Sequence, residues 1–176
     1  LCRPHGDVPL SAADVRSMAD SVMTPQQQAE FDAHWEMNLA IAMDEVGRFR
    51  VNLYRQRGDV AMAVRYITNR IPSIETLNLP PLLKDVVLLP RGLVLVVGST
   101  GSGKSTTLAS MVDYRNNHRA GHILTVEEPI EYLHRHRLSV VDQREVGLDT
   151  HSYANALKNA MREAPDVIMI GEIRDR

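Results

Sequence analysis

Residues 98–105 read G-S-T-G-S-G-K-S, an uninterrupted G-x-x-x-x-G-K-[ST] phosphate-binding sequence. In such a loop the glycines let successive backbone N–H groups face a phosphate, and the lysine reaches the β and γ oxygens. The last hydroxyl, here that of Ser105, is placed to bind Mg²⁺. The sequence predicts a nucleoside triphosphate site made by Gly98, Ser99, Thr100, Gly101, Ser102, Gly103, Lys104, Ser105 and Thr106.

The residues on either side of this loop support the same interpretation. The apolar run 93–97 predicts a buried strand before the loop, and residues 104–116 predict a helix after it. A helix N-terminus adds partial positive charge beside the phosphates. A Gly/Ser linker that contains a lysine by chance is the alternative, and this strand-loop-helix setting disfavours it.

Two acidic clusters follow apolar runs and could supply a general base and a metal ligand. Glu172 comes directly after the predicted strand 166–170, where its carboxylate could bind Mg²⁺ through water or polarise an attacking water. Residues 127–131, E-E-P-I-E, follow the predicted strand 122–127. Ligands collect at the carboxyl edge of open α/β sheets, although a surface acid and an ordinary acidic turn remain the alternatives.

Composition excludes several classes of protein. Lys plus Arg is 20 and Asp plus Glu is 22, a net charge of −2, so no general nucleic-acid or membrane footprint is expected. One cysteine permits no internal disulfide and fits a reducing cytoplasmic setting. No stretch reaches the ~20 apolar residues of a membrane span. The first residue is Leu1 and the last follows the second acidic strand closely, so we expect a fragment.

The pattern changes midway along the chain, which indicates two domains. Two helices within residues 11–34, capped at Ser11 and Thr24, precede three strands with a period of two, at 37–43, 48–56 and 60–68. Prolines interrupt residues 71–91, with short helical pieces at 74–77 and 82–88. We therefore expect a first domain over 1–70, a linker over 71–91 and a second domain over 92–176.

The second domain alternates strands with helices, which predicts an α/β fold with a mostly parallel sheet. After the loop and its helix, the expected elements are strands 122–127, 139–143 and 166–170 and the helix 153–163. His134 and His136 lie between them, beside Arg135 and Arg137. We interpret this segment as a solvated basic loop rather than a metal site, because the arginines disfavour a bound cation.

Taken together, these sequences resemble the type IV pilus retraction ATPases of twitching motility, within the secretion ATPase superfamily. The resemblance covers nearly the whole chain and is more specific than the phosphate loop alone. Within the family, the chain is most similar to the PilU-type accessory ATPases, with the PilT-type motors as the close alternative. The resemblance to the family rests on four motifs: Walker A (98–105), the Asp box (123–132), residues 143–147 and Walker B (164–175).

The resemblance implies a PAS-like α+β domain, incomplete at its start, before a RecA-like P-loop ATPase core that is truncated after Walker B. It implies a homo-hexameric ring that binds ATP and Mg²⁺ at subunit boundaries. Glu131 aligns with the general base, Glu172 with the Walker B glutamate, and Arg50 and Arg65 with arginines that reach the γ-phosphate. Expected partners are a PilT-type sister ATPase and a platform protein at the inner membrane, and no nucleic acid is expected. Through these partners, the protein is expected to be cytoplasmic and peripheral to the inner membrane.

Alternatives and departures from the family pattern stay open. The chain could be a nucleotide-binding accessory subunit that works only with a sister motor, or a related type II secretion or pilus extension ATPase. Glu128 stands where the family usually has Asp, and the His box that follows Walker B is absent. We expect the isolated chain to hydrolyse ATP weakly or not at all.

Overall fold

The protein divides into two compact units, Leu1–Tyr66 and Ile67–Arg176. The computed structural model describes residues 6–43, 46–68 and 70–172, and each unit is described by itself. Among the described residues, no helix combines the length and apolar character needed to cross a bilayer.

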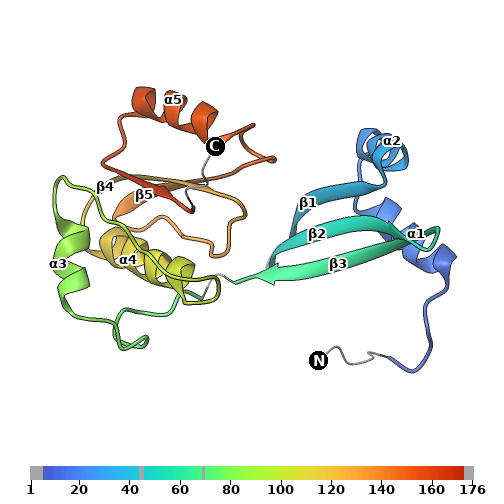
Figure 1. Cartoon of the computed structure of the whole chain (residues 1–176), viewed down its shortest axis with the longest axis horizontal. Coiled ribbons are helices and arrows are strands. Elements are labelled where there is room, and N and C mark those ends of the chain that lie inside the picture. The colour runs from blue at the N-terminus through green and yellow to red at the C-terminus, as the bar shows by residue number, and fades with distance from the viewer. Residues whose placement is uncertain (1–5, 44–45, 69, 173–176) are drawn as a thin grey trace. The chain divides into compact units, whose positions relative to one another are not determined.

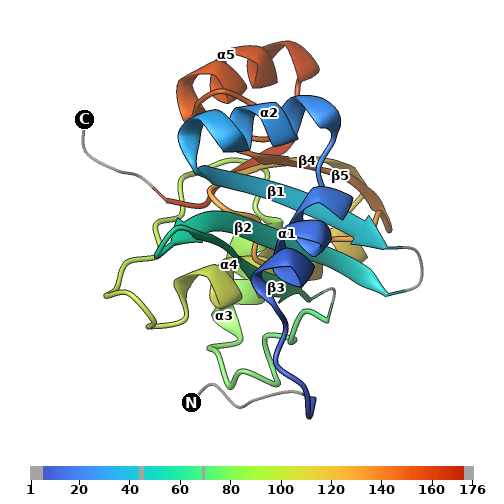
Figure 2. The same cartoon turned by 90° about the vertical axis from the view of Figure 1, so that its right-hand side faces the viewer.

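The first unit packs two helices on one face of a three-stranded sheet of order β1-β2-β3 (Figure 2). The strands β1 and β2 pair antiparallel. Both helices begin with capping boxes, at Ser11 and Thr24, the two positions where the sequence predicts N-caps. The elements are α1 (Ala12–Ser21), α2 (Pro25–His34), β1 (Glu36–Met43), β2 (Gly47–Gln56) and β3 (Asp59–Ile67).

One face of β2 forms the core of this unit. Val51 and Leu53 are fully buried and pack with Ala19 of α1 and Phe31 of α2. The predicted alternation along β2 is therefore confirmed, and its other face carries Arg50.

The second unit places helices on both faces of a parallel sheet of order β5-β4-β6 (Figure 1). Ile123 of β4 packs with Val112 of α4 on one face, while Leu124 packs with Ala156 and Ala160 of α5 on the other. The predicted α/β fold and parallel sheet are confirmed. The elements are α3 (Leu82–Leu88), α4 (Lys104–His118), β4 (Gly121–Glu127), β5 (Ser139–Glu145), α5 (Tyr153–Glu163) and β6 (Val167–Ile170).

Two predicted elements are wrong. Residues 93–97 form no strand, and the side chains of Leu93, Leu95 and Val97 are 83%, 64% and 89% exposed. A strand needs a neighbour for its backbone hydrogen bonds, and within the described residues this segment has none in either sheet. Residues 74–77 lie in a turn rather than a helix, and Asn78 follows with a positive φ of 52°.

Residues 71–91, which the sequence suggests are a linker, pack within the second unit. The Ser110 hydroxyl of α4 donates to the Pro72 carbonyl at 2.7 Å. Arg115, 3% exposed, donates to the carbonyls of Val87 and Leu89. These bonds anchor the segment, including α3, to the helix that begins at the phosphate loop.

Candidate nucleotide-binding site

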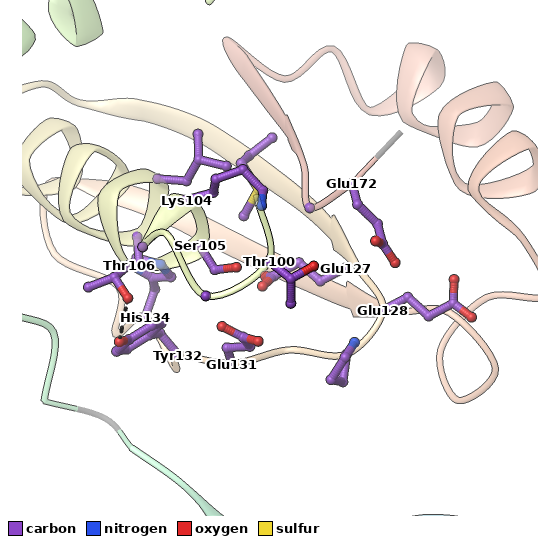
Figure 3. Close-up of a pocket in the computed structure, with 17 residues that line it drawn as sticks. Thr100, Lys104, Ser105, Thr106, Glu127, Glu128, Glu131, Tyr132, His134 and Glu172 are labelled. Carbon is purple, nitrogen blue, oxygen red and sulfur yellow. Dashed lines mark hydrogen bonds between the residues drawn. The ribbon is translucent and has the colours of Figure 1, made fainter. Parts of the chain in front are cut away.

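A pocket of about 430 Å³ opens where the phosphate loop meets the carboxyl ends of β4 and β6 (Figure 3). Because parallel strands end at the same edge of a sheet, the residues that follow β4 and β6 meet there. The pocket is lined by Thr100, Gly101, Gly103, Lys104, Ser105, Thr106, Leu108, Ala109, Glu127, Glu128, Pro129, Glu131, Tyr132, His134, Met169, Gly171 and Glu172.

The loop turns back sharply at two glycines. Gly101 and Gly103 have φ angles of 78° and 90°, which side chains other than glycine rarely adopt. Lys104 then begins α4, and its Nζ donates to the carbonyls of Gly98 and Ser99, each at 2.9 Å. The lysine head therefore lies at the loop, within reach of a phosphate that the loop would hold.

Most of the predicted nucleotide-binding residues line the pocket, and three others support the loop. Gly98 and Ser99 offer the carbonyls that hold Lys104, and neither lines the pocket. Ser102 also lies outside the lining, and a Cβ on Gly98 would lie 2.5 Å from its hydroxyl. Gly98 thus permits the close approach of the two ends of the loop.

The two carboxylates predicted from sequence lie at this pocket. Glu131 is in the segment after β4, and Glu172 follows β6. Figure 3 shows Glu131 and Glu172 around the same pocket as Thr100 and Ser105. The structure therefore brings a candidate base and a candidate metal partner to the same phosphate site.

Glu127, at the end of β4, is a third carboxyl group to which the sequence assigns no separate role. It is 8% exposed, and its Oε1 accepts hydrogen bonds from the Thr125 hydroxyl at 2.7 Å and the Gln143 amide at 3.2 Å. Burial raises the pKa of Glu127, against the opposing effect of these hydrogen bonds. Its position in the acidic cluster, as the last residue of a buried strand, is the signal that could have singled it out.

Two further lining residues, Tyr132 and His134, follow Glu131. The hydroxyls of Tyr132 and Thr106 lie 3.0 Å apart. Burial lowers the pKa of His134 from 6.5 to about 4, so this imidazole is neutral at pH 7. The interpretation of this segment as a solvated basic loop is therefore wrong for His134, because the imidazole packs against the pocket.

The donor atoms at the pocket fit Mg²⁺. This ion prefers oxygen ligands and is commonly held by one or two protein groups together with phosphates and water. The hydroxyl of Ser105 and the carboxylate of Glu172 are oxygen donors at the pocket. The described part of the chain contains no group of three or more His, Cys, Asp or Glu side chains arranged to bind a metal. A metal here would depend on the phosphates of the nucleotide.

Arg50 and Arg65 belong to the first unit, on β2 and β3. Arg50 is half-buried and Arg65 is exposed. Because the pocket belongs to the second unit, the contact of these arginines with a γ-phosphate stays a prediction.

The chain is similar to type IV pilus ATPases in sequence. It is 51% identical over 173 residues to the type IV pilus ATPase PilU of Pseudomonas aeruginosa, covering 98% of this chain and 45% of that protein. It is 41% identical to the type IV pilus retraction ATPase PilT of the same organism, covering 99% and 53%. The chain therefore spans about half the length of these relatives.

The fold matches two solved ATPase structures. A crystal structure of the pilus retraction motor PilT with bound ADP aligns with a TM-score of 0.86 and 46% identity, over 91% of this chain and 47% of that one. The Legionella pneumophila ATPase DotB aligns with a TM-score of 0.76 and 28% identity, over 97% and 49%. The sequence profile described as type II/IV secretion system protein matches residues 36–176. The chain thus belongs to the type II/IV secretion system protein family, as a PilT/PilU-like member.

Proposed function

We propose that the protein binds ATP with Mg²⁺ and hydrolyses it to drive type IV pilus retraction and twitching motility. One observation carries this proposal: the phosphate loop shares a single pocket with Glu131 and Glu172. The similarity to pilus ATPases supports the same activity.

The proposed reaction is phosphoryl transfer to water, in which positioning and charge stabilisation do most of the work. The backbone N–H groups of the loop and the Lys104 ammonium hold the phosphates. Glu131 takes the proton of the attacking water. Glu172 would bind Mg²⁺ through a water molecule or polarise the attacking water. Ser105 and Glu172 would hold Mg²⁺, which would neutralise the charge that develops on the phosphate oxygens.

The arginines of the first unit complete the proposed machinery. A guanidinium offers several N–H donors in a rigid fork, which suits the charge on a transferred phosphoryl group. We assign that role to Arg50 and Arg65, supported by the resemblance to pilus retraction ATPases and by the position of Arg50 on the face of β2 opposite the core.

The proposed setting is a homo-hexamer on the cytoplasmic side of the inner membrane. In it, the protein works with a PilT-type sister ATPase and with the platform protein at the pilus base. The similarity to both PilU and PilT supports this arrangement. Nucleic acid is not expected as a partner, because the net charge of −2 offers no general attraction for phosphate backbones.

The test is steady-state ATP hydrolysis by the full-length protein, alone and mixed with a PilT-type ATPase, with Lys104→Ala as the comparison. We expect turnover by the protein alone that Lys104→Ala abolishes. Turnover only in the mixture, lost with the same substitution, would instead make the protein an accessory subunit. No hydrolysis in either setting would contradict the proposal.

A further inference from the structure

The sequence 143–147, Q-R-E-V-G, belongs to the family resemblance, but the proposed reaction gives it no part. It covers the end of β5, next to β4 in the parallel sheet. Gln143 pairs in register with Thr125, and Glu145 with Glu127. Their side chains therefore lie at the edge of the sheet from which the segment with Glu131 departs.

Gln143 contacts this segment at both ends of its amide group. Its Nε2 donates to the Tyr132 carbonyl at 2.9 Å and to Glu127 Oε1 at 3.2 Å, while its Oε1 accepts from the His134 backbone N–H at 2.7 Å. One side chain thus joins the end of β4 to the backbone just beyond Glu131.

Glu145 holds the same segment on the other side of Glu131. Its carboxylate is 4% exposed and accepts a hydrogen bond from the Ile130 backbone N–H at 3.1 Å. Ile130 is itself 2% exposed, so the residue before Glu131 is fixed by packing and by this bond. The exposed Glu131 is thereby flanked by backbone groups tied to β5.

We infer that Gln143 and Glu145 are positioning residues that clamp residues 128–134 onto β5 and so hold Glu131 at the phosphate loop. This inference rests on the proposed role of Glu131 as the general base. A base must lie within hydrogen-bond reach of the proton that it takes, and small displacements of a catalytic group reduce turnover strongly. Neither clamp residue lines the pocket, so neither is expected to contact the nucleotide.

Two variants of the full-length protein, Gln143→Met and Glu145→Met, remove the hydrogen bonds and keep similar side-chain volume. We expect each to lower kcat for ATP by about 10- to 100-fold with KM changed by less than about threefold, because the phosphate loop is untouched. Glu145→Gln keeps an acceptor for Ile130 and is expected to restore turnover to within about threefold of the natural protein.

Asp142→Asn is the matched control on the same strand. Asp142 is exposed and its carboxylate lies 2.8 Å from His122 Nε2. Within the described residues it forms no hydrogen bond or ion pair with residues 128–134. We expect unchanged kcat and KM for this variant.

Amide hydrogen exchange of peptides covering 128–134, measured without nucleotide, gives a readout that does not depend on hydrolysis. We expect the methionine variants to exchange there about tenfold faster or more, while Asp142→Asn and peptides from α5 keep natural rates. If Gln143→Met fails to fold, Gln143→Glu replaces it, since it loses the Nε2 donors and keeps an acceptor for His134.

Normal kcat in both methionine variants, or unchanged exchange of 128–134, would overturn the inference. So would a loss in Glu145→Gln as large as in Glu145→Met, because the acceptor would then not be what matters. A natural protein that hydrolyses no ATP would contradict the proposed function alone, and the exchange measurement would still decide whether the clamp exists.

Discussion

The hydroxyl oxygens of Thr106 and Tyr132 lie 3.0 Å apart, and this contact joins the first turn of α4 to the residue that follows Glu131. Thr106 comes directly after Ser105, the proposed Mg²⁺ ligand. The hydrogen bond therefore links the phosphate side of the pocket to the segment with the proposed base, which Figure 3 shows as a direct bridge.

Tyr132→Phe removes only the hydroxyl of this bridge. One hydrogen bond contributes about 1 kcal/mol, so we expect kcat to fall about fivefold and nucleotide affinity to change little. Tyr114→Phe, in α4 and outside the pocket lining, is the matched control with natural kcat. Steady-state kinetics with both variants checks this, and equal rates for Tyr132→Phe and the natural protein would show that the bridge does not affect turnover.

Neutralising either proposed catalytic carboxylate should separate binding from chemistry. General base catalysis contributes about 10²- to 10⁴-fold, so we expect Glu131→Gln to lower kcat by at least about 100-fold. Glu172→Ala should also reduce turnover. Both should still bind a fluorescent ATP analogue, because Lys104 and the loop are unchanged. Natural turnover in Glu131→Gln would remove Glu131 from the role of base.

Arg50→Ala tests whether the first unit takes part in catalysis. We expect lower kcat with nucleotide binding retained, because a guanidinium that stabilises the transferred phosphoryl group acts mainly in the transition state. Arg48→Ala, two residues earlier on β2, is the matched control and should keep kcat within about twofold. If both variants turn over ATP at the natural rate, the assignment of Arg50 fails.

Sequence reasoning predicted the site where the chemistry is local. The phosphate loop is a contiguous pattern and Glu172 is an acid directly after an apolar strand, so both signals are local, whereas the role of Glu131 is implied by the resemblance to pilus retraction ATPases. The bounds of α5 agree with the helix predicted over 153–163, and the structure shows that Ser152 caps it by accepting from the Asn155 N–H, which is also a local feature. Such features need no knowledge of distant neighbours.

The rest depended on neighbours that a single sequence does not display. Residues 93–97 have strand-like composition, yet a strand also requires a pairing partner. The imidazole of His134 is neutral because the surrounding chain buries it, while its flanking arginines indicated a solvated loop. The bonds of Gln143 reach residues 9–16 positions away, which spacing alone does not reveal.

His134 should make the stability of the second unit depend on pH. Its folded pKa of about 4 lies below 6.5, so stability is complete above pH 6.5 and declines as the pH falls toward 4, where the unfolded chain binds the proton first. The gap corresponds to about 3 kcal/mol at most. His134→Gln should lose this decline, while His151→Gln, an exposed histidine, should keep it.

Thermal unfolding midpoints of the natural protein, His134→Gln and His151→Gln, compared at each pH between 8 and 5, check the predicted effect of His134. Glu127 acts in the opposite direction in the same pocket: burial raises its pKa, so its contribution is present at low pH and declines as the pH rises. The pH profile of one protein therefore combines the two effects. The difference in unfolding midpoint between His134→Gln and the natural protein isolates the contribution of the histidine. If this difference is the same at every pH, folding does not lower the pKa of His134 and the prediction is wrong.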